Sequence, residues 1–578
     1  MQTLRPEIQQ RIDTWLAGNY DQKTKNTIQD LLDNKAYDEL TDAFYKDLDF
    51  GTGGLRGIMG PGSNRVNVYT IGMATQGLAN FLTKTYPGEK IKVAIAHDSR
   101  IKSPLFAQTA AGVLSANGFT VYSFDALRPT PELSFAIREL GCHSGVMVTA
   151  SHNPKEYNGY KVYGSNGGQV VAPHDANIIQ EVRAIDSIDQ VKFAAIEENI
   201  VTIGSEMDEK YLSELCKLSI SQEEIKHQSD LKIVFSPIHG TGSPMVPDAL
   251  KRFGFDNVQV VEEQAMPDGN FPTVIYPNPE EEEALSMALA KGKEIDADLV
   301  MATDPDADRV GIAIQDAKGQ FMLLNGNQTG ALLIYYLLNA WEKHGKIDGN
   351  QYIVKTIVTS YLLDKIADSK NVECYNTLTG FKHIAQCMSD LEGQKTFIGG
   401  GEESYGYLVG DIVRDKDAVV AAAIIAEMTA YYKDQGSSLY ETLLAMYVEY
   451  GCYQEKLVSF TKKGKRGAEE IQEMMASFRK NPPTALAGEE VITIKDYQEG
   501  KAHHVGTGSS EQLDFPKSNV LQFVTDNGSI ISARPSGTEP KIKFYVSVNS
   551  PLEHTSQYEE TKNNLLKRID QLIADLNI

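Results

Sequence analysis

Three segments of the chain share one pattern of apolar and polar positions. Each is a run of apolar residues followed by a polar or glycine-rich turn and then by a helix-like pattern. The runs cover residues 91–96, 231–235 and 351–358. Because strands that are apolar on both faces are typical of sheets covered by helices on both sides, the pattern predicts three α/β units of roughly similar size.

The two ends of the chain do not follow this pattern. Residues 1–50 are polar, and apolar residues recur there at roughly helical spacing, which predicts short helices that cap the first unit. The last part of the chain predicts a smaller α+β domain, and a basic, glycine-containing stretch at residues 460–467 reads as the linker to it. The elements expected there are strands at residues 519–525, 529–533 and 541–548 and a polar helix from about Glu559.

Length and composition exclude several kinds of protein. A single hydrophobic core stops growing near ~250–300 residues, so a chain of 578 residues contains several domains. With 42% hydrophobic and 23% charged residues, the chain has a globular profile and not a disordered or fibrous one. The longest apolar stretch, residues 418–426, is far shorter than the about 20 residues of a membrane span. Residues 1–7 contain no apolar signal core, so we expect no export.

The net charge and the cysteines indicate which partners and which cellular location to expect. The formal net charge is −23, and an acidic surface repels nucleic acid and anionic lipid, so we expect neither nucleic acid nor a membrane as partner. The five cysteines are scattered without the spacing of a disulfide framework or a zinc site, which predicts a reducing, cytoplasmic location. A monomer and a dimer both stay open.

The most informative motif is an acidic turn after an apolar run at residues 297–302. Asp304, Asp306 and Asp308 alternate in this turn, and Arg309 follows them. Three carboxylates at alternate positions can converge on one cation, and oxygen ligands suit magnesium or calcium. The carboxyl end of a strand is also where α/β domains bind ligands. The alternative is an acidic turn on the surface.

A second motif is a Ser-His-Asn-Pro turn that begins at Ser151, directly after an apolar run at residues 146–150. A serine at the end of a strand often only caps a helix or stabilises a turn. The functional interpretation makes Ser151 a nucleophile, with His152 and Lys161 as its partners for protons or charge. The residues alone leave both interpretations open.

Two loops that contain glycine are candidates for holding a sugar phosphate. In residues 399–406, Glu402 and Ser404 lie two positions apart and suit sugar hydroxyls, unless the segment is an ordinary turn. In residues 534–538, an arginine, two hydroxyl side chains and backbone N–H groups look like a phosphate cradle, with a hairpin loop as the alternative. Arg56 stands in another glycine-rich stretch. The chain contains neither a Walker phosphate loop nor a complete dinucleotide-binding fingerprint.

Together and in this order, the four motifs resemble those of the α-D-phosphohexomutase superfamily. Within it, residues 50–57 and 377–382 are similar to the branch of phosphoglucomutases that also contains phosphopentomutases. The resemblance implies an α/β fold of four domains around a central cleft, with three similar α/β units and a smaller C-terminal α+β domain. The expected division, which starts with a helical extension, is 1–50, 51–210, 211–322, 323–455 and 456–578.

The resemblance also implies a reaction. A phosphate on Ser151 passes to glucose 1-phosphate and forms glucose 1,6-bisphosphate, which turns over so that Ser151 takes back the other phosphate. Mg²⁺ is held by the phosphoserine and the three aspartates, and Lys161 is the acid/base partner. The implied substrate-binding residues are Arg56, Arg309, Thr379, Glu402, Ser404, Lys416, Arg534, Ser536, Gly537 and Thr538.

Four other functions stay open at this point. Gly406 stands where members with dual glucose and mannose activity carry a histidine, which favours glucose over a phosphomannomutase. Likeness to phosphopentomutases keeps ribose 1-phosphate in play. A glucose 1,6-bisphosphate synthase would use a separate phosphoryl donor. A phosphosugar-binding regulator without activity would not need a serine that can be phosphorylated.

Overall fold

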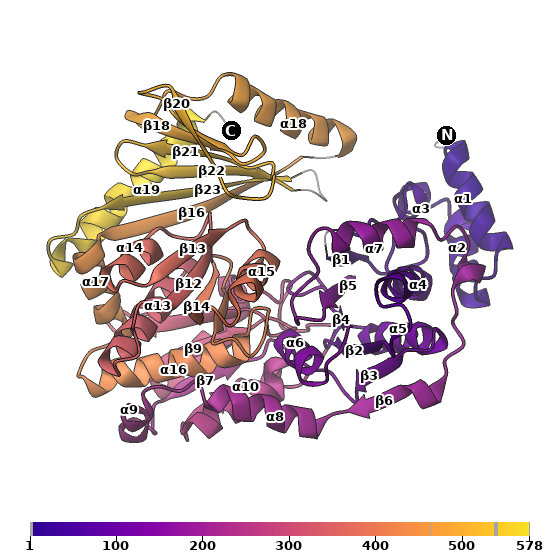
Figure 1. The fold of residues 1–578 in the computed structure, drawn as a ribbon, viewed down its shortest axis with the longest axis horizontal. Coiled ribbons are helices and arrows are strands. Elements are labelled where there is room, and N and C mark those ends of the chain that lie inside the picture. The colour runs from indigo at the N-terminus through magenta and orange to yellow at the C-terminus, as the bar shows by residue number, and fades with distance from the viewer. Residues whose placement is uncertain (1–3, 52, 463, 537–540, 577–578) are drawn as a thin grey trace.

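The computed structural model describes residues 4–51, 53–462, 464–536 and 541–576. Four sheets follow one another along the chain, and each defines a domain, which we number I to IV. Figure 1 shows domain IV, in orange and yellow, above domain III, with domain I and the N-terminal helices on the opposite side. Three α/β domains and a β-rich C-terminal domain confirm the predicted fold class.

The N-terminal extension consists of three helices that pack on domain I. They are α1 (Pro6–Ala17), α2 (Gln22–Asp33) and α3 (Tyr37–Phe44). Trp15 lies edge-on to Phe44 and to Tyr69 of the first domain, with ring centroids 5.6 and 5.8 Å away. Aromatic rings bury large apolar areas, so this cluster fixes the extension to domain I, as the apolar spacing at Leu40 and Phe44 predicts.

Domain I is a six-stranded sheet with helices on both faces. Its elements are β1 (Gly54–Ile58), α4 (Val68–Thr85), β2 (Lys92–His97), α5 (Ser103–Ala116), β3 (Thr120–Phe124), α6 (Thr130–Glu139), β4 (Ser144–Val148), β5 (Tyr157–Gly164), α7 (His174–Arg183), η1 (Ile188–Gln190), η2 (Glu197–Asn199) and β6 (Ile200–Ile203). The strand order is β1-β5-β4-β2-β3-β6. In β2, Val93 and Ile95 pack against α4 and α5, whereas Ala94 and Ala96 pack toward α6 on the other face. This two-sided burial explains the apolar run at residues 91–96.

Domain II has the strand order β11-β10-β9-β7-β8. Its elements are α8 (Ser205–Cys216), α9 (Gln222–His227), β7 (Ile233–Ser236), α10 (Gly242–Phe253), β8 (Val258–Val260), α11 (Glu262–Ala265), α12 (Glu282–Ile295), β9 (Leu299–Thr303), β10 (Val310–Gln315) and β11 (Phe321–Leu323). All five residues of β9 are buried, and the strand ends at the acidic turn. The turn therefore starts from a rigid, central strand, at the edge of the sheet where the sequence places it.

Domain III has the strand order β13-β12-β14-β15, and three of these strands are parallel. Its elements are α13 (Gly326–Lys343), β12 (Gln351–Thr356), α14 (Leu362–Ser369), β13 (Glu373–Thr377), α15 (Phe381–Leu391), β14 (Thr396–Glu402), β15 (Gly406–Val409), α16 (Ala418–Asp434) and α17 (Leu439–Tyr450). The longest apolar stretch of the sequence opens α16, whose first fifteen residues are all buried. This helix packs against α10, so it joins domains II and III.

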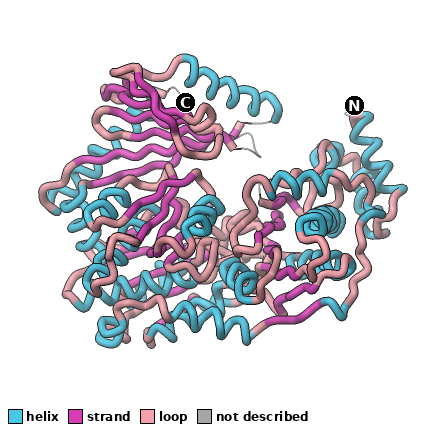
Figure 2. Tube along the Cα trace, viewed as in Figure 1, coloured by secondary structure: helices cyan, strands magenta, loops and turns pink. Residues whose placement is uncertain are grey.

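Domain IV is an antiparallel sheet in the order β16-β23-β22-β21-β18-β19-β20, with β17 paired to β18. Its strands form the magenta layer at the upper left of Figure 2. Its elements are β16 (Cys452–Thr461), α18 (Gly464–Lys480), β17 (Ala485–Leu486), β18 (Glu489–Asp496), β19 (Lys501–His504), β20 (Ser509–Gln512), β21 (Leu521–Thr525), β22 (Ile530–Pro535), β23 (Lys541–Ser550), η3 (Thr555–Gln557) and α19 (Tyr558–Asp575). Phe460 lies in β16 and Arg466 in α18, so the linker expected at residues 460–467 is wrong for these residues. The strand β16 crosses the expected boundary at residues 455/456 because it pairs with β23 along its whole length.

A short strap, residues 411–418 between β15 and α16, ties three domains together. It leaves domain III, contacts domains I and II, and returns to start α16. The donor and the acceptor of each hydrogen bond that the strap makes are buried. Each bond therefore replaces the hydrogen bonds to water that these groups lose on folding. They are Arg414 N to Ser134 Oγ, Tyr163 Oη to Asp415 Oδ2, Tyr211 Oη to Asp417 Oδ2 and Ala418 N to Ala307 O, at 2.8, 2.8, 2.8 and 3.1 Å.

All five cysteines carry free thiols. Within the ranges that the structure describes, no helix is both long and apolar enough to cross a bilayer.

Candidate functional site

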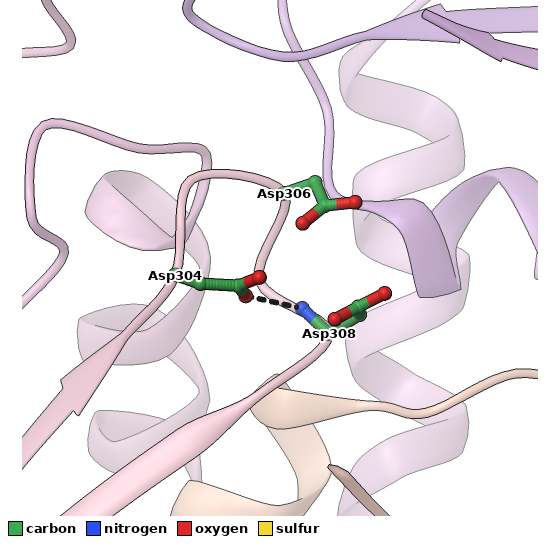
Figure 3. Close-up of side chains that lie close together, drawn as sticks. All are labelled: Asp304, Asp306 and Asp308. Carbon is green, nitrogen blue, oxygen red and sulfur yellow. Dashed lines mark hydrogen bonds between the residues drawn. The ribbon is translucent and has the colours of Figure 1, made fainter. Parts of the chain in front are cut away.

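The acidic turn brings three buried carboxylates together. Asp304, Asp306 and Asp308 offer oxygen atoms that lie within 4.8 Å of one another (Figure 3). Asp304 Oδ1 accepts from the backbone N–H groups of Asp308 and Arg309, at 3.0 Å each, which closes the turn. Ala307 has a φ of 49°, in the left-handed region, and this conformation turns the chain back toward its start.

These carboxylates fit a divalent cation. Among the described residues, Asp306 Oδ1 and Asp308 Oδ1 are buried without any hydrogen-bond donor. A buried carboxylate oxygen without a partner is costly, and an ion with oxygen ligands would satisfy both atoms. The acidic turn on the surface is therefore the wrong alternative, since all three side chains are buried.

Ser151 of domain I lies directly against this turn of domain II. Its Oγ donates to Asp304 Oδ2 at 2.7 Å and lies 3.2 Å from His152 Nδ1. Ser151 is 3% exposed and has a φ of 50°. A non-glycine residue in this region costs free energy that the surrounding structure must supply, and such residues concentrate at functional sites. The geometry therefore favours the nucleophile over the simple turn serine.

Arg100 holds the backbone of the serine turn, and sequence reasoning missed it. Its side chain is 1% exposed and pairs with Asp98, with Nε 3.2 Å from Oδ2. The only sequence signal is the polar turn that follows the apolar run at residues 91–96. The guanidinium donates to four carbonyl groups of the turn, those of Ser151, Asn153, Pro154 and Tyr157.

Two lysines from different domains neutralise the acidic turn. Lys161, on β5, lies 2.8 Å from Asp306 Oδ2 and 3.3 Å from Asp308 Oδ2. Lys416, in the strap, lies 3.1 Å from Asp308 Oδ2. Burial lowers the pKa of Lys161, but the two carboxylates outweigh it, and the pKa lies above its usual value. Lys161 is therefore an ammonium donor and not a ready base in this state.

The pKa values of the buried groups at the acidic turn and the serine turn shift in different directions. Burial and the neighbouring carboxylates raise the pKa of Asp304 well above its usual value. Burial would also raise the pKa of Asp306, but Lys161 and its hydrogen bonds bring it below the usual value. Burial and the nearby cations Arg309 and Arg56 lower the pKa of His152 well below its usual value, so its imidazole is neutral.

The loop at residues 399–406 approaches the acidic turn from domain III. Glu402 Oε1 accepts from the backbone N–H of Gly380 at 2.8 Å, which fixes the segment that contains Thr379. The Thr379 hydroxyl is buried and has no hydrogen-bond partner among the described residues. Burial and Glu402 raise the pKa of Glu403 to about 7. Two acidic side chains and a hydroxyl thus gather where the sequence predicts a sugar site.

Gly406 closes this loop under the side chain of Lys416. A Cβ at position 406 would lie 2.0 Å from Lys416 Cδ. Real Cβ atoms do not approach so closely, because van der Waals repulsion rises steeply below about 3.5 Å. A side chain at position 406 and Lys416 in this position therefore exclude each other.

Domain IV contributes a pair of cations on neighbouring strands. Arg534 of β22 stands opposite Lys543 of β23, and burial with the charges of Lys541 and Arg534 lowers the pKa of Lys543. Like charges opposite each other in a sheet are destabilising, which favours an anion as their partner. Sequence reasoning missed Lys543, although it alternates with Lys541 after the predicted loop. Ser536 is half-buried, whereas Gly537 and Thr538 lie outside the described residues.

Arg56 reaches the serine turn from β1. Its Nη1 donates to Asn153 Oδ1 at 3.0 Å. Arg309, which follows the acidic turn, has its Nη1 3.1 Å from the carbonyl oxygen of Ser404. The structure thus brings Ser151, the aspartates, both lysines and Arg309 together, while Arg534 stands on β22 of domain IV, opposite Lys543.

Comparison with protein families gives three matches along the chain. Residues 47–189 match "Phosphoglucomutase/phosphomannomutase, alpha/beta/alpha domain I", and the corresponding domains II and III match residues 209–319 and 325–449. A curated phosphoglucomutase of Staphylococcus haemolyticus is 37% identical over 541 residues, 93% of this chain and 94% of its own. A phosphoglucomutase of Staphylococcus aureus is 38% identical over 522 residues, 89% of this chain and 92% of its own.

Solved structures share the fold at lower sequence identity. Parafusin, a phosphoglucomutase of Paramecium, superposes with a TM-score of 0.66 at 18% identity, covering 92% of this chain and 96% of its own. A phosphoglucomutase/phosphomannomutase family protein of Burkholderia thailandensis gives a TM-score of 0.62 at 18% identity, covering 90% and 96%.

Proposed function

Because the chain belongs to the phosphoglucomutase/phosphomannomutase family, within the α-D-phosphohexomutase superfamily, we propose that it interconverts glucose 1-phosphate and glucose 6-phosphate. It is thus an enzyme of the isomerase class that moves a phosphoryl group within one sugar. The observation that carries the proposal is the 2.7 Å bond between Ser151 Oγ and Asp304 Oδ2, which joins a strained serine to a buried acidic turn.

In the proposed reaction, Ser151 carries the phosphoryl group. Phosphoserine bears a charge of roughly −1.5 to −2 at neutral pH, and Lys161, Lys416 and Arg309 are the cations that offset it. Asp304, Asp306, Asp308 and a phosphoserine oxygen would hold Mg²⁺, which withdraws charge from the bridging oxygen when it is bound. Phosphoryl transfer depends mainly on such positioning and charge neutralisation.

The proton balance of the proposed reaction uses two side chains, those of Lys161 and His152. When the sugar hydroxyl attacks phosphorus, the Oγ–P bond breaks, and the hydroxyl proton must in the end reach Ser151 Oγ. We assign the transfer to the Lys161 ammonium, which lies 2.8 Å from Asp306 in the same acidic turn that Ser151 Oγ contacts: it gives a proton to Oγ and regains one from the hydroxyl. In the return step, Oγ attacks the other phosphorus and the sugar O–P bond breaks. Lys161 then gives a proton to the sugar oxygen and regains one from Oγ, and the neutral imidazole of His152, 3.2 Å from Oγ, can relay that proton.

Both sugar orientations must bind, since glucose 1,6-bisphosphate turns over between the two transfers. Glu402, Ser404 and Thr379 are assigned to the sugar hydroxyls. Arg534, with Ser536, Gly537 and Thr538, is assigned to the phosphate that does not react, and Lys543 lies beside it. The position of Arg534 opposite Lys543 supports this assignment, because two cations on neighbouring strands favour an anion as their partner.

The partners follow from the same chemistry. A phosphosugar is the proposed ligand, and the net charge of −23 disfavours nucleic acid and anionic membranes. We propose a cytoplasmic location and a monomer or dimer. Gly406 and the Lys416 side chain over it leave no space for the histidine of dual-specificity members, which supports glucose over mannose.

A coupled assay on three sugar phosphates tests the proposal. We expect kcat/KM to be highest for glucose 1-phosphate when it is compared with mannose 1-phosphate and ribose 1-phosphate, each with Mg²⁺ and activating bisphosphate. A preference for mannose or ribose would make the protein a phosphomannomutase or phosphopentomutase. Net formation of glucose 1,6-bisphosphate from a separate donor would make it a bisphosphate synthase.

Replacing Arg534 tests the role of domain IV. Arg534→Ala should raise KM for glucose 1-phosphate by roughly ten- to a hundredfold and lower kcat as well, because Arg534 both binds the phosphate and sets which sugar end faces Ser151. Arg534→Lys should restore part of this, since lysine keeps the charge but loses the bidentate fork. The control is Arg466→Ala, because the Arg466 side chain lies in the same domain and is 90% exposed. Unchanged kinetics in Arg534→Ala would leave a plain hairpin loop.

A further inference from the structure

The two edges of the Arg309 guanidinium have different surroundings. Nη1 donates to Glu280 Oε1 at 2.6 Å and to the Ser404 carbonyl oxygen at 3.1 Å, which uses both of its hydrogens. Nε is buried without a hydrogen-bond partner among the described residues, and Asp308 Oδ1 lies 3.8 Å from it. A guanidinium binds phosphate through two parallel N–H groups on one edge. The edge that contains Nε is therefore the one left for an anion, and it faces the acidic turn.

Glu280 comes from a rigid part of domain II. The residues before it, Pro277, Asn278 and Pro279, are buried, and α12 begins two positions after it. The backbone of Pro279 lies so close to Gly311 of β10 that a Cβ on that glycine would be 2.2 Å from the Pro279 carbonyl oxygen. The Glu280 carboxylate is thus presented by backbone that packs on the sheet, which is what precise placement of another side chain requires.

We propose that Glu280 is a positioning residue for Arg309, and that it presents the Nε edge of the guanidinium to the phosphate of the substrate. The inference rests on the proposed function and adds a residue to its phosphate-binding machinery. An arginine held at only one point loses much of its advantage, because its flexible side chain must give up rotamer freedom on binding. Glu280 and the Ser404 carbonyl remove that freedom before the substrate arrives.

The alternative is that Glu280 competes with the substrate for Arg309. The geometry argues against it, because Glu280 occupies Nη1 and leaves the Nε edge untouched. The phosphate then does not need to displace the carboxylate. The two roles predict opposite changes in KM, so kinetics separates them.

The test is a double-mutant cycle in the full-length enzyme with glucose 1-phosphate. Glu280→Ala should lower kcat/KM about tenfold, mainly through KM, and Glu280→Gln should keep most of it, since the amide oxygen still accepts from Nη1. In an Arg309→Ala background, Glu280→Ala should change kcat/KM less than twofold, because groups that act through one another are not additive. Glu282→Ala, an exposed acid of the same run, is the matched control and should match the wild type.

Three results would overturn the proposal. A fall in KM in Glu280→Ala would show competition, an equal loss in both backgrounds would show a structural role, and no loss in Glu280→Ala would show no role. Calorimetric titration of inorganic phosphate into the wild type, Glu280→Ala, Arg309→Ala and the double variant repeats the cycle without turnover. Wild-type protein that turns over no sugar phosphate would refute the proposed function, while the phosphate cycle would still decide on Glu280.

Discussion

Ser151→Ala should abolish mutase turnover, with a loss of at least about 10⁴-fold in kcat, because covalent transfer has no other acceptor in the site. The fold should persist, since alanine adopts the same backbone and the lost hydroxyl contacts Asp304 and His152, both within the site. Steady-state kinetics on glucose 1-phosphate gives the loss. Intact-mass spectrometry should show a phosphorylated fraction in the wild-type protein and none in the variant.

Two further variants make this result specific. Ser151→Gly removes the same hydroxyl and suits the φ of 50° at this position, so it separates chemistry from backbone strain. Ser165→Ala, an exposed serine after β5, should keep full activity and phosphorylation. Turnover near the wild-type level in both Ser151 variants would remove this residue from the reaction.

Removal of the divalent cation should silence the enzyme reversibly. After exhaustive treatment with EDTA we expect activity to fall at least about a hundredfold and to return with Mg²⁺, because Asp306 and Asp308 each keep a buried oxygen that has no hydrogen-bond partner in the described part of the chain. Mg²⁺ should also raise the melting temperature of the stripped protein, since a ligand that binds only the folded state stabilises it. Zn²⁺ should bind but support turnover poorly, because it favours tetrahedral sites.

Chelation is a cleaner test than substitution of the aspartates. Asp308→Asn would also remove one of the two carboxylate partners of Lys161 and of Lys416, which keep Asp306 and Asp415, and loss of one partner from a buried ion pair costs about 3–5 kcal/mol of stability. The control for EDTA is the same treatment with Mg²⁺ in excess of the chelator. Full activity after stripping would show that the carboxylates only stabilise the joint between domains I and II.

The sequence predicts the secondary structure best where burial is two-sided. The apolar runs at residues 91–96, 231–235 and 351–358 become β2, β7 and β12, because strands buried on both faces leave no polar positions to confuse the pattern. The basic stretch at residues 460–467 misleads, because Phe460 and Thr461 end the edge strand β16 and Arg466, 90% exposed, lies in the first turn of α18. The charged residues and glycines of this stretch indicate exposure to solvent and not a linker between domains.

The site is harder to predict because its contacts join distant parts of the chain. The motifs identify Ser151 and the acidic turn, but nothing local shows that Lys161 pairs with Asp306, or that Arg100 holds the serine turn. The raised pKa of Lys161 depends on this pairing, so its charge state was beyond sequence reasoning. The same holds for Glu280, which reads as one acid in a run of four.

The strap at residues 411–418 has a consequence for dissecting the protein. A fragment that ends before it would leave the buried hydroxyls of Tyr163 and Tyr211 without acceptors, at about 1–3 kcal/mol each. It would also uncover the face of α10 that α16 covers, and exposed apolar surface of this kind promotes aggregation. Domains I and II are therefore not modules that can be expressed alone, and insertions or fusions belong at the chain ends, outside the part that the strap binds together.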